Sequence, residues 1–260
     1  GKYVIPNIDK GINYLNLSAN QNNSQAQRNL GILYYYGKYC KRDTNKAIQY
    51  LLLASNQNDI EAQFQLGVIY EGLYIVRDIN KSLHYYKLAK MQNHFVSLFN
   101  LGMIYYEGKF INRNIKKAIK YLSLSSDQNY TKAQIVLGDI YYEGIYVNKD
   151  IDKALYYYNL AANRNNPDAH FKLSLFFSEE KYFAKDINKF IHHLMLAANL
   201  NHSYAQLNIG LIYYRGYLNI KQDIKKGIYY ITLSSDNENR DANFSLGFLY
   251  HEGFNVDRNI

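Results

Sequence analysis

Apolar and polar positions follow one another along this chain with the period of an α-helix. Around residues 26–34, the apolar positions recur at i, i+4, i+7 and i+8, as Ala26, Leu30, Leu33 and Tyr34. This spacing places them on one stripe of a helix with about 3.6 residues per turn. A second helical spacing, i, i+3, i+4 and i+7, occurs at Ala47, Tyr50, Leu51 and Ala54, and the loops between such segments are too short for strands. Proline occurs only at Pro6 and Pro167, near predicted helix starts, where it is tolerated. The pattern predicts an all-α array of helical hairpins.

The hairpins repeat with a fixed register of about 36 residues. A Leu-Gly step, or a close variant, marks each unit: Leu30-Gly31, Leu66-Gly67, Leu101-Gly102, Leu137-Gly138, Leu173-Ser174, Ile209-Gly210 and Leu246-Gly247. An aromatic residue follows three positions later: Tyr34, Tyr70, Tyr105, Tyr141, Phe177, Tyr213 and Tyr250. A second glycine closes the segment: Gly1, Gly37, Gly72, Gly108, Gly144, Gly216 and Gly253. Self-similarity at this period is typical of solenoids, whose units bury their apolar faces by stacking.

A polar residue suited to cap a helix precedes the second helix of each hairpin. It occupies Asn7, Asp43, Asp78, Asn114, Asp150, Asp186, Asp223 and Asn259. Asp and Asn accept hydrogen bonds from the free N–H groups of a first helical turn. A lysine stands three residues on, at Lys10, Lys46, Lys81, Lys117, Lys153, Lys189 and Lys226. The block predicts where each second helix begins.

The repeated glycines have structural interpretations. A glycine inside a helix costs roughly 1 kcal/mol relative to alanine, so a repeated one predicts a closely packed partner helix. The small residue after each lysine should lie on the facing side, as at Ala47, Ser82, Ala118, Ala154 and Gly227. The aromatic residue should fill the gap between the two helices, and the second glycine should form a left-handed C-cap.

These residues together resemble the Sel-1-like repeat, a relative of the tetratricopeptide repeat. The shared pattern is Ala, Leu-Gly, Tyr and Gly, then Asp, Lys-Ala and Tyr, with Ala-Ala near the end of the second helix at Ala161-Ala162 and Ala197-Ala198. The resemblance covers residues 1–260 as a single solenoid of six full repeats with half repeats at the ends. It implies a right-handed superhelix of antiparallel helix pairs that serves as a non-enzymatic adaptor or scaffold.

Composition restricts the class of protein and its expected location in the cell. The chain has 260 residues, 48% of them hydrophobic, and no apolar stretch long enough to span a bilayer. One cysteine excludes an intramolecular disulfide, which favours a reducing, cytoplasmic location. Abundant Asn, Ile, Lys and Tyr with no Trp suggest an AT-rich gene, such as those of giant viruses, for which the location would be the host cytoplasm. The sequence does not start with Met and looks like a trimmed piece of a longer chain, so secretion stays open.

The net charge of +8 raises a second possible function. Seven lysines occupy the single repeated position, so the basic excess is distributed along the repeats. Stacked repeats would align these lysines into a ridge able to bind RNA or another polyanion. The alternative is that each lysine is solvated or paired locally near its helix cap.

Residues for catalysis or metal binding do not converge in the sequence. The histidines lack metal-ligand spacing, although His192, His193 and His202 could meet across a hairpin. Cys40 occupies a position that is aliphatic in other repeats, which predicts a packing role. No catalytic residue, cofactor or metal site is predicted.

A binding surface is therefore expected among positions that packing does not use. On each first helix, a stripe opposite the Ala-Leu-Tyr core carries aromatic residues, and the candidate contacts are Tyr35, Phe64, Phe99, Tyr106, Tyr142, Phe171, Tyr214 and Phe244. By analogy with tetratricopeptide arrays, this stripe lines a concave groove for a peptide or protein partner, because Tyr and Phe are effective anchors. The same stripe could instead pack consecutive repeats together.

The fifth repeat departs most from the pattern. Ser174 replaces the helix glycine, Glu180 replaces the loop glycine, and Phe190 replaces the small residue after Lys189. A bulky residue at a close helix contact predicts a local change in curvature over residues 167–200.

Overall fold

The computed structural model describes residues 7–178 and 186–252, and within these ranges every regular element is a helix. Five positions of the sequence pattern lie outside the described residues: the loop glycines at 1 and 253, the proline at 6, the substituted loop glycine at 180 and the helix cap at 259. The fourteen described helices are α1 (Ile8–Asn20), α2 (Ser24–Tyr36), α3 (Thr44–Asn56), α4 (Ile60–Tyr70), α5 (Ile79–Met91), α6 (Phe95–Glu107), α7 (Ile115–Ser126), α8 (Thr131–Glu143), α9 (Ile151–Ala162), α10 (Pro167–Ser178), α11 (Ile187–Asn199), α12 (Ser203–Arg215), α13 (Ile224–Asp236) and α14 (Arg240–Glu252).

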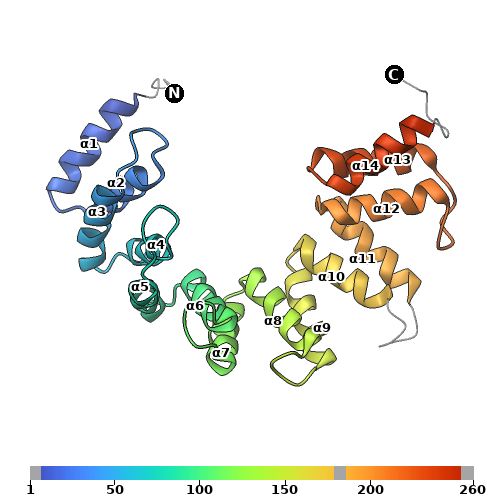
Figure 1. Ribbon diagram of the computed structural model, residues 1–260, viewed down its shortest axis with the longest axis horizontal. Helices are drawn as coiled ribbons and strands as arrows, with labels where there is room; N and C mark the ends of the chain where they lie inside the picture. The colour runs from blue at the N-terminus through green and yellow to red at the C-terminus, as the bar shows by residue number, and fades with distance from the viewer. Residues whose placement is uncertain (1–6, 179–185, 253–260) are drawn as a thin grey trace. The chain divides into compact units, whose positions relative to one another are not determined.

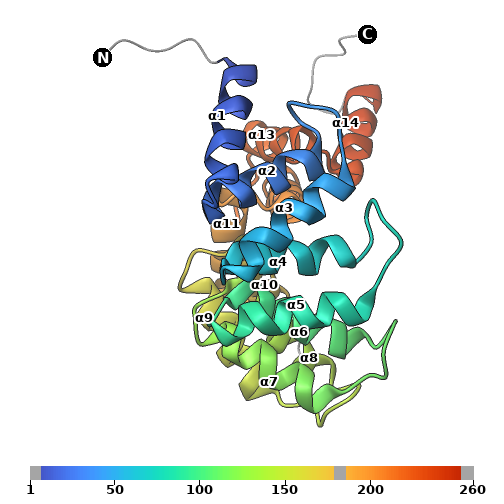
Figure 2. The same cartoon turned by 90° about the vertical axis from the view of Figure 1, so that its left-hand side faces the viewer.

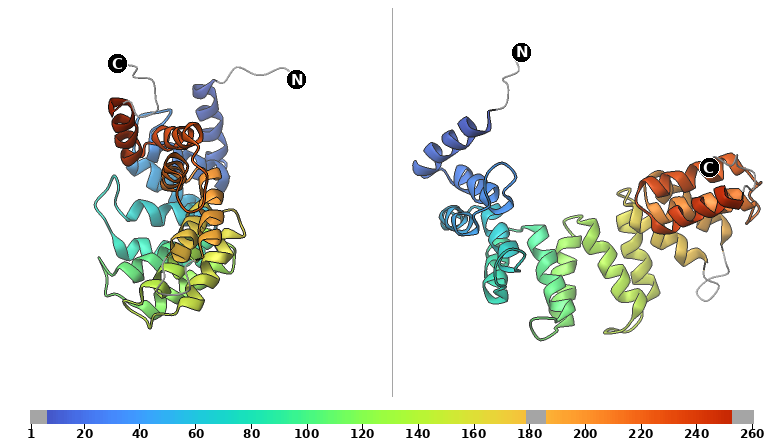
Figure 3. Two further views of the ribbon diagram at one scale, coloured as in Figure 1. Left: turned by 90° about the vertical axis from the view of Figure 1, so that its right-hand side faces the viewer. Right: turned by 45° about the horizontal axis from the view of Figure 1, so that its top comes forward.

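Each even-numbered helix is the first helix of a hairpin, here called helix A, and the odd-numbered helix after it is helix B (Figure 1). The helices group into two compact units, residues 1–128 and 129–260. In the first unit, the loops that join helix A to helix B lie along one edge (Figure 2). In the second unit, α8–α9, α10–α11 and α12–α13 form successive pairs in the same manner (Figure 3). The expectation of a single uninterrupted domain stays a prediction.

The predicted caps are confirmed. In all seven described cases, the side chain of the Asp or Asn before helix B accepts a hydrogen bond from the backbone N–H of the repeated lysine, as for Asp43 and Lys46 at 3.0 Å. At the end of helix A, Gly37, Gly108, Gly144 and Gly216 adopt the left-handed conformation as C-caps. Gly72 also has a positive φ but follows Glu71, which is the C-cap of α4.

The glycine inside helix A is explained by contact with helix B of the same repeat. A Cβ atom added at Gly67 would lie 2.5 Å from ring carbons of Tyr86, and one added at Gly138 would lie 2.4 Å from Tyr158. Gly31, Gly102 and Gly210 face Leu51, Leu122 and Ile231 at 2.5–2.7 Å in the same way. The small residue after the lysine makes the reciprocal contact, since a Cβ on Gly227 would meet the Tyr214 backbone nitrogen at 2.7 Å. The prediction of close helix packing is confirmed.

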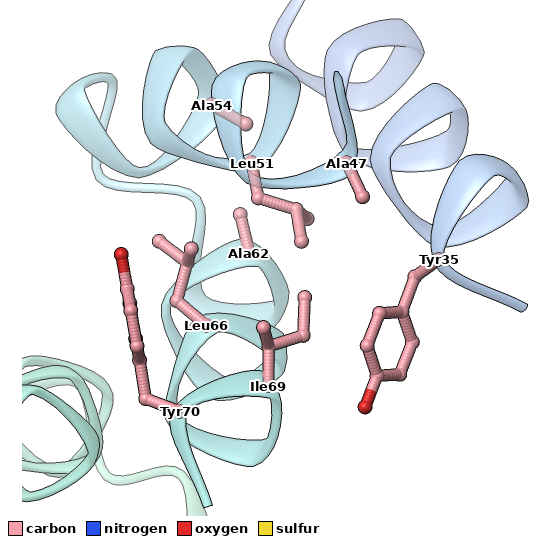
Figure 4. Close-up of a cluster of buried hydrophobic side chains, with 8 residues drawn as sticks. All are labelled: Tyr35, Ala47, Leu51, Ala54, Ala62, Leu66, Ile69 and Tyr70. Atoms are coloured by element: carbon pink, nitrogen blue, oxygen red, sulfur yellow. The ribbon is translucent and has the colours of Figure 1, made fainter. Parts of the chain in front are cut away.

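The core of each unit lies between the two helices of a repeat and the next helix A. Figure 4 shows one cluster in the first unit, in which Leu51 and Ala54 of α3 face Leu66 and Ile69 of α4. The aromatic residue after the helix glycine fills the gap between helices A and B, as predicted. Its ring stacks on helix B in the pairs Tyr34–Tyr50, Tyr70–Tyr85, Tyr105–Tyr121, Tyr141–Tyr157, Phe177–His193 and Tyr213–Tyr230.

In the fifth repeat, Ser174 is fully buried and donates a hydrogen bond to the Phe171 carbonyl at 2.7 Å. Phe190 is half-buried and packs against the cluster around Leu194 and Ile209. The hairpin therefore accommodates both substitutions. The change in curvature expected there stays a prediction.

Candidate binding surfaces

The predicted aromatic stripe on helix A is partly built into the contacts between repeats. Tyr35 is 1% exposed and belongs to the core cluster in Figure 4, so its side chain is part of the core and does not line the surface. Phe244, on the last described helix, is 76% exposed. The remaining six candidates are half-buried: Phe64, Phe99, Tyr106, Tyr142, Phe171 and Tyr214. Five of these six, all but Phe99, pack against buried clusters of the core, so packing, the alternative interpretation of this stripe, accounts for part of their burial.

Two stripe residues rest on a histidine that caps the next helix A. The Phe64 ring lies 4.8 Å from the ring of His94, and the Phe171 ring lies 4.2 Å from that of His202. In each histidine, Nδ1 accepts a hydrogen bond from the backbone N–H three residues on, at 3.2 Å. The other ring nitrogen faces a carboxylate of the preceding repeat, Glu61 at 3.3 Å or Asp168 at 3.6 Å.

Burial lowers the pKa of His94 and of His202, and the neighbouring carboxylate partly opposes this shift in both cases. The sequence reasoning missed these caps. The sequence nevertheless contains a pattern that marks these caps. An acidic residue stands three positions before a phenylalanine, and a histidine follows that phenylalanine by about 30 positions. The pattern occurs twice, as Glu61, Phe64 and His94 and as Asp168, Phe171 and His202.

A recess opens beside the first of these histidines, between the starts of α4 and α6. It has a volume of about 420 Å³, and its lining includes Arg28, residues 58–61 and residues 92–95. The Arg28 guanidinium forms an ion pair with the cap residue Asp59 at 3.1 Å, and the Phe95 ring is 39% exposed. In the second unit, a recess of about 590 Å³ occupies the equivalent place between α12 and α14, lined in part by Tyr204 and Phe244. Each recess can seat a side chain of a bound peptide between aromatic and charged groups.

The repeated lysines are engaged locally. The ammonium group lies over the aromatic ring of the same repeat at 4.1–5.4 Å, in the pairs Lys46–Tyr34, Lys81–Tyr70, Lys117–Tyr105, Lys153–Tyr141, Lys189–Phe177 and Lys226–Tyr213. Four of them also pair with the cap carboxylate, as Lys153 does with Asp150 at 2.9 Å. Hydrogen bonds from the backbone and side chain of Lys153 lower the pKa of Asp150. This arrangement matches the locally paired alternative more closely than a ridge of free charges.

The loops between helix A and helix B carry a second set of cation–aromatic contacts. Arg42 lies over the ring of Tyr74 at 3.6 Å, and Arg77 lies over the ring of Phe110 at 3.8 Å, so each arginine bridges to the loop of the next repeat. The Arg77 side chain also donates to the Glu71 carbonyl at 2.6 Å. The sequence reasoning missed this contact, although aromatic and arginine residues recur two and five positions after the loop glycine.

The histidines of the fifth repeat meet in pairs and do not form a metal site. Nδ1 of His170 lies 3.1 Å from Nδ1 of His193, and the His193 ring stacks on Phe177. His202 contacts Phe171 and Asp168 instead, so the trio of His192, His193 and His202 is not brought together. In the described part of the chain, no group of three or more His, Cys, Asp or Glu side chains is placed to hold a metal ion. Cys40 is half-buried, and burial raises the pKa of its thiol.

The successive helix pairs define the class of protein: an α-solenoid of helical hairpins. The Sel1 repeat family model matches residues 1–23, 24–59, 60–94, 96–130, 131–166, 203–239 and 240–260. The chain therefore belongs to the Sel1 repeat family, whose members generally mediate protein–protein interactions and are generally not enzymes. Besides residue 95, the family model leaves residues 167–202 unmatched, and these cover the irregular fifth repeat.

Solved structures share the fold. A Sel1 repeat protein from Oxalobacter formigenes is 28% identical with a TM-score of 0.83, over 96% of this chain and 73% of that one. A protective antigen with an SLR fold from uropathogenic Escherichia coli is 24% identical with a TM-score of 0.79, over 98% of this chain. This chain covers 54% of that antigen, about half its length. The immunity protein PA5088 from Pseudomonas aeruginosa is 17% identical with a TM-score of 0.54, over 82% of this chain and 80% of that one.

No curated protein matches the sequence. The bacterial sources of these structures lend no support to the giant-virus origin that the composition suggests. None of the helices described here is both long and apolar enough to cross a bilayer.

Proposed function

We propose that this protein is a non-enzymatic scaffold that binds a peptide segment of a protein partner on the helix A surface. The observation that carries the proposal is the half-buried state of the stripe aromatics. Core clusters hold Phe64, Tyr106, Tyr142, Phe171 and Tyr214 in place, and each of these residues is only partly buried. Aromatic side chains fixed in this way lose little conformational entropy on binding, which is why they serve as anchors.

The recess beside His94 supplies the polar part of the proposed site. Arg28, Asp59 and Glu61 place charges of both signs around its rim, next to the exposed edge of Phe95. Such a rim suits a peptide that carries an apolar side chain flanked by charged ones. The local pairing of the repeated lysines supports this function over binding to RNA or another polyanion.

The test measures binding of a displayed peptide library to the purified protein. Peptides selected by the wild type should lose about tenfold or more in affinity when Phe99 and Tyr106 are both changed to Ala, since a central aromatic anchor contributes about 1–2 kcal/mol or more. The matched control changes the loop aromatics Tyr39 and Phe110 to Ala, because these lie outside the stripe. Circular dichroism establishes that each variant remains folded.

Raising the salt concentration separates the two functions. Peptide binding dominated by apolar anchors should change less than threefold between 50 and 500 mM NaCl, whereas binding to RNA should weaken by orders of magnitude (~100-fold or more). Equal affinity of the stripe variant and the wild type for every selected peptide would contradict the proposed site.

A further inference from the structure

The loops that join helix A to helix B in the first unit carry exposed apolar side chains. These loops are residues 37–43, 71–78 and 108–114, here called the loop edge, and they lie along one side of the unit (Figure 2). The exposed fractions are 54% for Tyr39, 69% for Leu73, 40% for Tyr74, 92% for Val76 and 44% for Phe110. Because apolar groups gain free energy when they leave water, their concentration at one edge indicates a surface that a partner covers.

Cationic side chains lie among these apolar groups. The three loops contain six exposed cations: Lys38, Lys41, Arg42, Arg77, Lys109 and Arg113. Two of the acids in the loops, Asp43 and Asp78, are helix caps that pair with Lys46 and Lys81. A third, Glu71, accepts a hydrogen bond from Tyr86, and Glu107 is an exposed acid at the end of α6. The loop edge therefore carries a net positive charge together with its apolar groups.

The aromatic rings of the loop edge are poorly placed to stack on nucleic-acid bases. The Arg42 guanidinium lies over the Tyr74 ring at 3.6 Å, and that of Arg77 lies over the Phe110 ring at 3.8 Å. Nucleic acid binds single strands by stacking bases on ring faces, and arginine already covers a face of each of these rings. Leu73 and Val76, the most exposed apolar residues here, have no ring on which a base could stack.

The loop edge also differs from the helix A surface in shape. The recess lined by Arg77, Glu107 and Phe110 has a volume of about 70 Å³, compared with about 420 Å³ for the recess beside His94. Protein partners are usually held by large side chains that fill pockets. A small recess surrounded by exposed aliphatic side chains fits such a partner less well than a broad, soft surface.

We propose that the loop edge binds the surface of an anionic lipid bilayer. Leu73 and Val76 insert among the lipid headgroups, where aliphatic side chains leave water, and the loop cations contact lipid phosphates. Tyr39 lies at the same level, since tyrosine has an apolar ring and a polar hydroxyl that suit the interface between water and hydrocarbon. The positive charge of the edge is complementary to anionic headgroups, which selects this bilayer over a neutral one. The protein would thus be a scaffold attached to a membrane surface.

The first measurement is cosedimentation of the protein with lipid vesicles. Vesicles of phosphatidylcholine containing about 30% phosphatidylglycerol should bind the wild type about tenfold or more tightly than vesicles of phosphatidylcholine alone, because several cations each add to the attraction. Binding should weaken as the salt concentration rises, since salt screens the attraction between exposed charges.

A pair of serine substitutions tests the aliphatic contribution. Leu73→Ser with Val76→Ser removes two exposed apolar side chains and leaves the charge unchanged, so affinity for the anionic vesicles should fall about tenfold or more. The matched control is Leu53→Ser with Met91→Ser, which makes the same kind of change at exposed positions in the last turns of α3 and α5, at the ends of these helices away from the loop edge. This control should bind like the wild type.

A pair of glutamine substitutions tests the charge. Lys41→Gln with Lys109→Gln removes two loop cations and should lower affinity for the anionic vesicles about tenfold or more. The control, Lys87→Gln with Lys120→Gln, lowers the net charge by the same amount at exposed positions on α5 and α7. It should bind more tightly than the loop variant. Circular dichroism establishes that each variant remains folded.

Three results would overturn the proposal. One is a wild type that does not sediment with the anionic vesicles, and another is an equal loss of binding in the loop variants and their controls. The third is a loss of binding in the glutamine variant with none in the serine variant, which would indicate attraction of a polyanion, such as RNA or an acidic protein, by charge alone.

The inference goes beyond the proposed function and is tested separately from it. Changing Tyr39 and Phe110 to Ala should weaken vesicle binding and leave binding of the selected peptides unchanged. Changing Phe99 and Tyr106 to Ala should have the opposite effects. Failure of either proposal is therefore distinguishable from failure of the other.

Discussion

Replacing Gly67 by Ala is expected to lower the free energy of unfolding by about 2 kcal/mol, although alanine is the better helix former by roughly 1 kcal/mol. The added Cβ would lie 2.5 Å from two ring carbons of Tyr86. That ring is fully buried, and its hydroxyl group is held by hydrogen bonds with Glu71 and Asn100. The ring therefore cannot slide away without breaking these contacts. Urea unfolding monitored by circular dichroism measures the change.

The same substitution at Gly247 is the matched control. No described atom lies within 4 Å of its added Cβ, so in a protein of these 260 residues Gly247→Ala should leave stability unchanged or raise it by up to about 1 kcal/mol. Opposite signs for one chemical change at equivalent repeat positions would isolate the effect of packing. A Gly67→Ala variant as stable as the wild type would show that α4 and α5 separate freely enough to admit a methyl group.

Lowering the pH from 7 to about 4 is expected to destabilise the second unit through the pair formed by His170 and His193. Burial, together with the nearby His170, His192 and Lys189, lowers the pKa of His193 to about 4. Burial and His192 also lower the pKa of His170. Both rings are therefore neutral in the folded chain at pH 7, and their Nδ1 atoms lie 3.1 Å apart.

The direction of the effect follows from proton linkage. In the unfolded chain both histidines titrate near pH 6.5, so that state binds more protons than the folded state below this pH. Stability is fully present above about pH 6.5 and is lost as the pH falls toward the folded pKa of His193, about 4. Because both rings are only partly buried, we expect a loss of about 1–2 kcal/mol, read from urea midpoints across this range.

The control uses the residues that other repeats carry at these positions. The double variant His170→Gln with His193→Tyr matches Gln134 and Tyr157 of the fourth repeat. It removes both titrating groups, and its stability should vary less with pH than that of the wild type. Parallel pH profiles for the two proteins would refute the contribution of the histidine pair.

The binding surface was only partly predictable from the sequence. Helical spacing placed all eight stripe residues on one face of helix A, but spacing does not measure how closely the next repeat approaches. Tyr35 is consequently buried, whereas Phe244 is largely exposed. The histidine caps at His94 and His202 were missed because a cap histidine in one repeat contacts the phenylalanine of the repeat before it. Contacts between repeats are separated by about 30 residues and have no local signature.

A further repeated residue in the sequence predicts the turns between repeats. Asparagine recurs with the repeat at the turn between helix B and the next helix A, at Asn22, Asn58, Asn93, Asn129, Asn165 and Asn201, and each has a positive φ of 54–65°. Asparagine tolerates this conformation better than other residues with a side chain, so its recurrence predicts a left-handed turn. The seventh equivalent, Glu238, adopts the same φ of 60° without that preference.

The sequence by itself determined the helices, their caps, the repeat length and the need for a close partner at each helix glycine, because these properties depend on residues within one repeat. Tertiary structure alone decided which aromatics are buried and that the lysines lie on rings. Burial depends on the distance between surfaces of different helices, and that distance is set by how consecutive repeats pack.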